Sequence, residues 1–239
     1  MQDVISSESE SDDSSAILTR ALLVCGVVVA PLFTLVAVIE MLTRPGFDLR
    51  RHDLSLLSNG EQGWIQIANF VIAGVLTIAA AVGVGRAIHS GRASRWGPVL
   101  IGIYGVGWIG AGVFVADPMN GFPPGTPNGL PTSASWHSWM HLVSGSIGFL
   151  ALIAACIVFA RRFANLRQTG WMAYSIITGL VVLAAIVGIS SGSQQSVVIV
   201  AFFIAGILSL AWISVLCEHL IAQSRRLVTA QDSNSLRDK

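Results

Sequence analysis

The sequence predicts an all-α integral membrane protein, a bundle of six transmembrane helices with both termini in the cytoplasm. The 239 residues are 53% hydrophobic and only 11% charged, with a mean hydropathy of +0.70. A soluble domain carries roughly 25% charged residues, so this chain has too few charges to cover a water-exposed surface. Six apolar runs are each long enough to cross a hydrocarbon core of about 30 Å as a helix. The basic residues also gather on one side of such a bundle, which fixes its expected orientation.

The six helices are expected at 16–42, 64–88, 96–116, 136–160, 170–189 and 196–220. Backbone groups in lipid must be hydrogen-bonded within the segment, so the apolar runs are helical. Together they form one transmembrane domain over 16–220. Residues 1–15 are acidic and serine-rich and are predicted to be a disordered tail, and residues 221–239 form a cytoplasmic tail. Pro31 predicts a kink in the first helix.

The distribution of lysine and arginine predicts the orientation. If both termini are cytoplasmic, only Arg44, Arg50 and Arg51 lie outside. The remaining basic residues lie inside: Arg20, Arg86, Arg92, Arg95, Arg161, Arg162, Arg167, Arg225, Arg226, Arg237 and Lys239. This bias agrees with an even number of spans and predicts a multi-pass protein of the cell membrane, surrounded by lipid. The net charge of +1 indicates no nucleic-acid partner.

Several small residues within the predicted helices indicate packing rather than chemistry. Gly107 and Ala111 are four apart in the third helix, and Ser144 and Gly148 are four apart in the fourth. Small residues at this spacing let helix backbones approach closely in lipid. The three cysteines are Cys25, Cys156 and Cys217, and each lies within a predicted helix, as expected of small packing residues rather than of a disulfide framework.

The longest polar interruption runs from Asp117 to His141 and predicts the roof of a site at the extracytoplasmic end. Glycine and proline fill its middle, which indicates a shaped loop. His137 and His141 are four apart, so they project from one face of the fourth helix. Two histidines at this spacing can bind one metal ion, although no glutamate lies between them as in a zinc protease. Histidines that serve only interfacial solvation or hydrogen bonding are the alternative.

The second half of the expected site lies in the loop before the second helix, at 52–55. Zinc would be bound by His52, His137 and His141, with Asp117 as a further ligand or a partner of one. Ser55 would stabilise a developing oxyanion, and Asp117 or Asp53 would move a proton.

Two further residues of this loop, Arg50 and Arg51, have two interpretations. They form an anion clamp for a phosphate or carboxylate group, or they pair with local acids and lipid phosphates.

Two resemblances rest on these residues. The motifs HDLSLLS at 52–58, FVADP at 114–118 followed by GFPPGTP, and WHSWMH at 136–141 resemble the bacterial membrane-protein family called domain of unknown function 998 (DUF998). That resemblance covers roughly 16–220 and implies six transmembrane helices without implying an activity. A looser pattern of early histidine and serine, then an aspartate, then HxxxH is similar to the alkaline ceramidase and progestin-adipoQ receptor superfamily of membrane zinc hydrolases. It implies that His52, His137 and His141 bind zinc while Ser55 and Asp117 assist.

The leading functional hypothesis is metal-dependent hydrolysis of a lipid-like substrate. The first alternative is a non-enzymatic protein or carrier that binds a lipid or another small molecule, which the outer arginines and glycine-rich helices favour. The second alternative is a membrane scaffold that binds another membrane protein through its last two helices, because these contain few polar residues.

Overall fold

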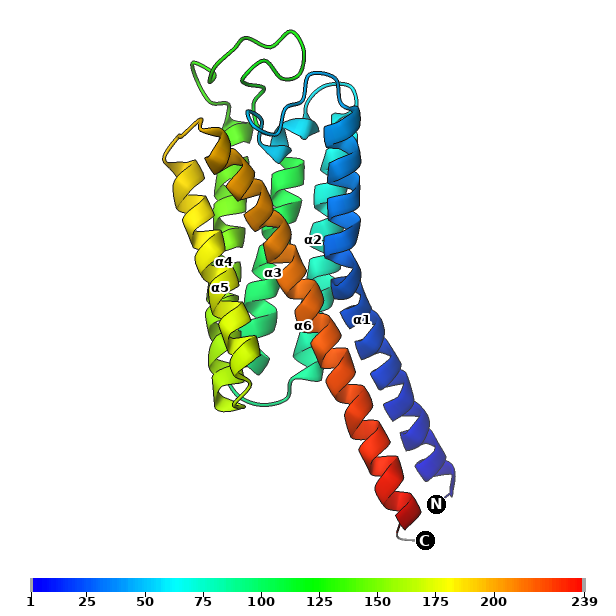
Figure 1. Cartoon of the computed structure of the whole chain (residues 1–239). Helices are drawn as coiled ribbons and strands as arrows, with labels where there is room; N and C mark the ends of the chain where they lie inside the picture. The colour runs from blue at the N-terminus through cyan, green and yellow to red at the C-terminus, as the bar shows by residue number, and fades with distance from the viewer. Residues whose placement is uncertain (1, 238–239) are drawn as a thin grey trace.

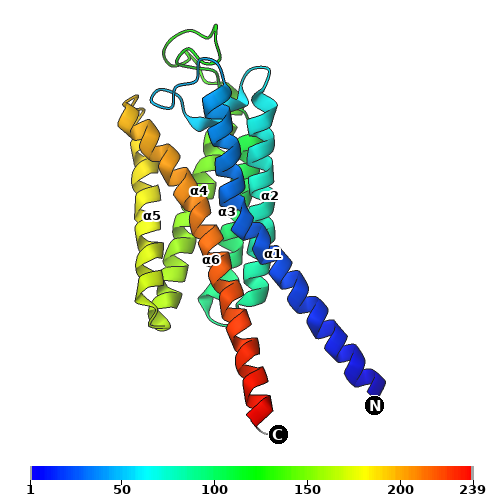
Figure 2. The same ribbon diagram turned by 45° about the vertical axis from the view of Figure 1, so that its right-hand side comes forward.

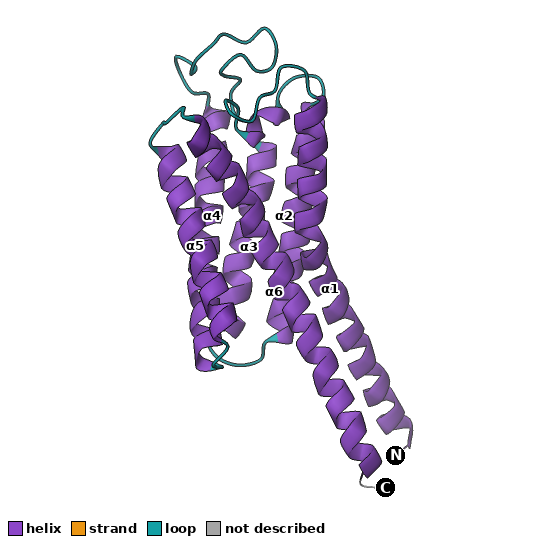
Figure 3. Cartoon of the chain, viewed as in Figure 1, coloured by secondary structure: helices purple, strands orange, loops and turns teal. Residues whose placement is uncertain are grey.

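The structure is a computed structural model that describes residues 2–237, with side chains described for residues 14–226. The long helices are α1 (Gln2–Thr43), α2 (Gly63–Ala87), α3 (Arg92–Val113), α4 (Trp136–Asn165), α5 (Thr169–Ser190) and α6 (Ser196–Arg237). Figure 3 shows helices and loops only over this described part. The six helices are long and apolar enough to cross a membrane, which confirms the predicted all-α fold class.

The helix boundaries differ from the predictions at two kinds of place. α3 ends at Val113 rather than at residue 116, because Phe114 takes an extended conformation with φ −97° and ψ 100°. Pro118 follows four residues later and keeps Asp117, the residue directly before it, out of the helical conformation. α1 and α6 run further than expected, from Gln2 and to Arg237. Most side chains of the two predicted tails, those of 1–13 and 227–239, lie outside the described part.

The helices form a ring in the order of the chain. Each helix packs against its sequence neighbours, and α6 closes the ring by packing against α1 (Figures 1 and 2). α1 contains Pro31 and changes direction part-way along, and both termini lie at the same end of the bundle (Figure 1). The opposite end, which we call the capped end, carries the loops 44–62, 114–135 and 191–195. The short helix η1 (Leu54–Ser58) lies within the first of these loops.

Aromatic side chains fill the interior toward the capped end. Trp108 of α3 packs edge-on against Phe33 of α1, with ring centroids 4.6 Å apart, and lies 5.4 Å from the Phe70 ring of α2. Phe149 of α4 contacts Trp108 at 6.4 Å and Phe202 of α6 at 5.8 Å. Five of the six helices therefore meet through one aromatic cluster, and each buried ring adds apolar contact area that stabilises the bundle.

Close backbone contacts and buried hydrogen bonds join the helices. A Cβ placed on Gly107 would lie 2.8 Å from the Gly148 Cα, which confirms the tight α3–α4 packing expected from the small residues. The Ser214 hydroxyl of α6 donates to the Gly26 carbonyl of α1 at 2.8 Å, and the Trp212 indole donates to the Ser175 hydroxyl of α5 at 3.1 Å. The three cysteines are free thiols inside helices, as predicted.

Candidate functional site

His52 joins two loops of the capped end. Its Nδ1 accepts the Asp48 backbone N–H at 2.9 Å, and its Nε2 lies 3.0 Å from the Asn120 carbonyl, to which it donates. The buried ring lies between Phe47 and Phe122, with centroids 5.5 Å and 5.4 Å away. Both ring nitrogens are therefore hydrogen-bonded to backbone groups, and neither is free to bind a metal.

Asn120 is the point at which the three loops of the capped end meet. Its carbonyl accepts from His52, and its side-chain amide donates to the Gln194 side chain at 2.8 Å and to the Arg51 carbonyl at 3.3 Å. Asn120 has a φ of 55°, a left-handed conformation that asparagine tolerates better than most residues. Sequence reasoning missed this residue; the Asn-Gly pair at 120–121 is a turn signal that identifies the conformation but not the contacts.

The outer arginines stabilise this cap. Buried Arg44 donates to the Glu40 carboxylate at 3.3 Å and to the Leu57 carbonyl at 2.9 Å, and its guanidinium lies 5.5 Å from the centre of the Phe122 ring. Exposed Arg50 pairs with Asp48 at 3.2 Å, and this hydrogen-bonded guanidinium lowers the Asp48 pKa. Arg51 reaches the Asn120 carbonyl and the Asn128 side chain, both at 3.4 Å. Arg50 therefore pairs with a local acid, which was one of the two interpretations of the sequence. The other interpretation, an anion clamp formed by Arg50 and Arg51, stays a prediction.

Asp117 closes the 114–135 loop at the start of α4. Its carboxylate accepts the Ser135 backbone N–H at 2.7 Å, and its own N–H donates to the Ser138 hydroxyl at 3.4 Å. Ser135 in turn caps α4 by accepting the Ser138 N–H at 3.1 Å. The ends of consecutive helices are thus brought together as the sequence indicates, with Asp117 acting through backbone hydrogen bonds.

The two histidines of α4 have different environments. His137 is exposed, and its ring stacks on Trp136 with centroids 3.7 Å apart. The Nδ1 of His141 lies 3.0 Å from the Ala111 carbonyl and 2.9 Å from the Phe114 carbonyl, so it carries the proton and donates to the end of α3. The Nε2 of a neutral His141 therefore carries the lone pair. Within residues 14–226, no protein group hydrogen-bonds this nitrogen.

A cavity of about 230 Å³ lies beneath the cap, inside the ring. All six helices and η1 contribute to its lining, mostly with apolar side chains that include the aromatic cluster described above. Small residues, Gly145 on α4 and Gly206 on α6, leave it open, because a Cβ on either would meet no atom within 4 Å. Such a space is typical of a small-molecule site, which is concave, mostly apolar and has a few placed polar groups.

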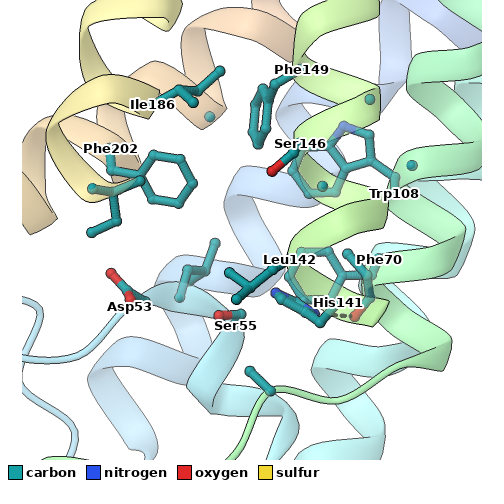
Figure 4. A pocket seen from close by; sticks show the side chains of 18 of the residues that line it. Asp53, Ser55, Phe70, Trp108, His141, Leu142, Ser146, Phe149, Ile186 and Phe202 are labelled. Atoms are coloured by element: carbon teal, nitrogen blue, oxygen red, sulfur yellow. Dashed lines mark hydrogen bonds between the residues drawn. The ribbon is translucent and has the colours of Figure 1, made fainter. Parts of the chain in front are cut away.

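Three of the predicted site residues meet at one end of this cavity. Asp53, Ser55 and His141 all line it, and Figure 4 shows them together at one end, with Phe149, Ile186 and Phe202 at the other. One Asp53 carboxylate oxygen is buried and has no hydrogen-bond partner. Burial away from water raises the pKa of Asp53 to about 6, since desolvation disfavours the charged form.

The predicted zinc ligands do not fit a metal in this arrangement. Across the side chains described at 14–226, no group of three or more His, Cys, Asp or Glu residues is placed to hold a metal ion. The chemistry of the donors agrees, because His52 uses both nitrogens on backbone groups and His137 stacks at the surface. The zinc site stays a prediction of the sequence pattern.

A buried donor of the cavity escaped sequence reasoning. Trp108 lines the cavity, and its buried indole N–H lies close to the Tyr104 hydroxyl without forming a well-aligned hydrogen bond. Buried tryptophans usually find a partner for this group, and the group beside it here is the Tyr104 hydroxyl. No short motif distinguishes Trp108 from the interfacial tryptophans of the chain.

Comparison with known proteins gives the family and no activity. Searches of curated proteins and of solved structures found no match. Nothing found supports the similarity to alkaline ceramidases. A family profile described as a protein of unknown function (DUF998) matches residues 27–219, most of the chain, and confirms the first resemblance. The chain therefore belongs to the DUF998 family.

Proposed function

We propose that the protein binds a small amphiphilic, lipid-like molecule in the cavity beneath the cap. The polar group of that molecule lies at Asp53, Ser55 and His141, and its apolar part lies among the aromatic side chains. The observation that carries the proposal is the lining, in which apolar residues from all six helices surround a space with three polar side chains at one end.

The size of the cavity limits what it holds. A buried cavity of about 150 Å³ accommodates benzene, so by proportion 230 Å³ accommodates about nine non-hydrogen atoms. A head group with a chain of eight or so carbons fits this space, and a longer lipid would leave part of its chain outside. Ten-carbon probes have eleven or twelve non-hydrogen atoms, so they fill this space and leave only a short part of the chain outside it.

Filling the cavity tests the proposal. Tritiated decanol is titrated onto the full chain in nanodiscs, with empty nanodiscs subtracted. Gly206→Leu and Gly145→Leu place a side chain in the cavity and should abolish saturable binding. Gly170→Leu is the matched control, because Gly170 is exposed, lies outside the lining and has equal space for a Cβ. Binding that is equal in all four proteins, or absent from the wild type, contradicts the proposal.

Hydrolysis of the bound molecule is the second candidate function. Ser55 supplies a hydroxyl and His141 an unprotonated ring nitrogen at the same end of the cavity. Release of p-nitrophenol from its decanoate ester by the wild type, lost in His141→Phe and kept in Gly170→Leu, would support an enzyme. Saturable binding without release leaves a binding protein or carrier.

We propose further that the protein resides in the cell membrane with the capped end outside and both termini in the cytoplasm. The support is the charge distribution, since basic residues are rare in the loops of the capped end and frequent at the opposite end. A lipid-like molecule would then reach the cavity from the outer half of the bilayer.

A further inference from the structure

The charge of the cavity lining limits the head group that the cavity accepts. Asp53 is the one acidic residue among the described lining residues, and no lysine or arginine is among them. A phosphate or carboxylate placed at this end would lie beside a carboxylate without a compensating cation, which is costly in a water-poor space.

The Asp53 carboxylate is not neutralised by the protein. Its side chain does not cap η1, although Asp53 occupies the N-cap position, and one oxygen is buried without a partner. The nearby arginines are engaged elsewhere: Arg44 with Glu40 and loop carbonyls, Arg50 with Asp48, and Arg51 with Asn120 and Asn128. Within the described residues, the ion pairs are those of Arg44 and Arg50.

A second acceptor lies at the same end. The His141 proton is on Nδ1 and is shared between two carbonyls, so the Nε2 lone pair is left to accept a hydrogen bond. Figure 4 shows the Asp53 carboxylate and the His141 ring at the polar end of the cavity, with the Ser55 hydroxyl between them. Both the carboxylate and the imidazole lone pair accept hydrogen bonds, so this end of the cavity favours a ligand that brings hydrogen-bond donors.

We propose that the ligand class is an amphiphile with a protonated amine head, which donates to the Asp53 carboxylate at the end of the cavity that Ser55 and His141 also line. An alcohol head, with one donor and no charge, binds more weakly, and an anionic head is excluded. This inference rests on the proposed function, because it names the head group of the molecule that the cavity binds.

Matched ten-carbon probes test the head group. Tritiated decylamine is bound to the full chain in nanodiscs at pH 7.5, and unlabelled decanol and decanoate are used as competitors. We expect decylamine to bind most tightly, decanol to compete at higher concentration and decanoate not to compete. Asp53→Asn should weaken the binding of decylamine by about tenfold, since it removes a charge-assisted hydrogen bond. It should leave the affinity for decanol within about twofold of the wild-type value. Asp48→Asn is the control, because it makes the same change in the same loop outside the lining.

The outcomes separate the two proposals. If Gly206→Leu leaves the binding of every probe unchanged, the cavity is not a binding site and the proposed function fails. If decanol or decanoate binding is lost in Gly206→Leu but decylamine shows no advantage, the cavity binds amphiphiles and the amine assignment is wrong. Equal decylamine affinity in wild type and Asp53→Asn also overturns the assignment.

Discussion

His52 and Asp53 are neighbours in the chain but differ in their hydrogen bonding. His52 has a partner for each ring nitrogen, whereas Asp53 keeps a buried carboxylate oxygen without one. Fully bonded buried polar groups stabilise a fold, and an unbonded one lowers its stability unless a ligand completes it. At the scale of the residue, His52 therefore belongs to the structure of the cap, and Asp53 belongs to the cavity.

His52→Phe should destabilise the protein. Phenylalanine keeps the ring between Phe47 and Phe122 but leaves the Asp48 N–H without a partner and the Asn120 carbonyl with only the 3.4 Å contact of exposed Arg51, a loss of roughly 1–3 kcal/mol. His137→Phe is the control, because His137 is exposed and stacked on Trp136, and should be neutral. Thermal unfolding in detergent measures both, and equal melting temperatures for the two variants would count against the role given to His52.

Asp53→Asn should stabilise the ligand-free protein at neutral pH. Burial raises the Asp53 pKa from 3.8 to about 6, so the folded state holds this proton more tightly than the unfolded chain does. The contribution of Asp53 to stability is therefore largest below about pH 4 and falls by up to about 3 kcal/mol as the pH rises through 6, a loss that the amide avoids. Melting curves of both proteins from pH 4 to 7.5 should diverge with rising pH, and parallel curves would contradict this.

Packing between helices depends on glycine at some contacts and not at others. α3 and α4 approach each other at Gly107 and Gly148, whereas Gly145, one turn away on α4, faces the open cavity. An added methyl group therefore clashes with backbone at one position and enters empty space at the other. Gly107 and Gly145 are therefore a matched pair of positions for testing the α3–α4 interface.

Gly107→Ala should lower stability by about 1–3 kcal/mol, because overpacking displaces one helix from the other. The new Cβ would lie 2.8 Å from both the Gly148 Cα and the Ser144 carbonyl oxygen. Gly145→Ala should be neutral or slightly stabilising, since alanine favours the helix and the site is open. Thermal unfolding in detergent measures the melting temperature of both variants. Equal melting temperatures for Gly107→Ala and Gly145→Ala would refute the close contact between α3 and α4.

The helices were predictable and the cap contacts were not. A long apolar run in lipid has no alternative to the helix, so the six spans follow from composition alone. The end of α3 was misplaced because Phe114 is apolar like the helix before it, and no local signal marks its extended conformation. Likewise, no sequence pattern distinguishes a histidine held between two phenylalanines from one that binds zinc. Asp53, Ser55 and His141 line one cavity in the structure, whereas His52 and His137 have other contacts.

At the scale of the whole molecule, an even number of helices places both ends of the chain on one side (Figure 1). We predict that this side is cytoplasmic. Green fluorescent protein fused after Lys239 should fluoresce in bacterial cells, and alkaline phosphatase at the same point should be inactive. A cysteine replacing exposed Thr132 in the α3–α4 loop should be labelled by a membrane-impermeant maleimide in intact cells. The opposite pattern would reverse the topology.

The closing of the ring by α6 has a consequence for biosynthesis. α1 to α4 are synthesised first and already hold Phe33, Phe70, Trp108 and Phe149, but the wall formed by α5 and α6 is still missing. Until α6 reaches α1, one side of the future cavity faces lipid. Contacts between consecutive helices form early because they are local in the sequence. The α6–α1 contact forms last because it joins the first and the last helix of the chain. In the proposed membrane setting, a nascent chain therefore acquires its enclosed site only when its last helix inserts, and the open side of that site would face lipid acyl chains until the ring closes.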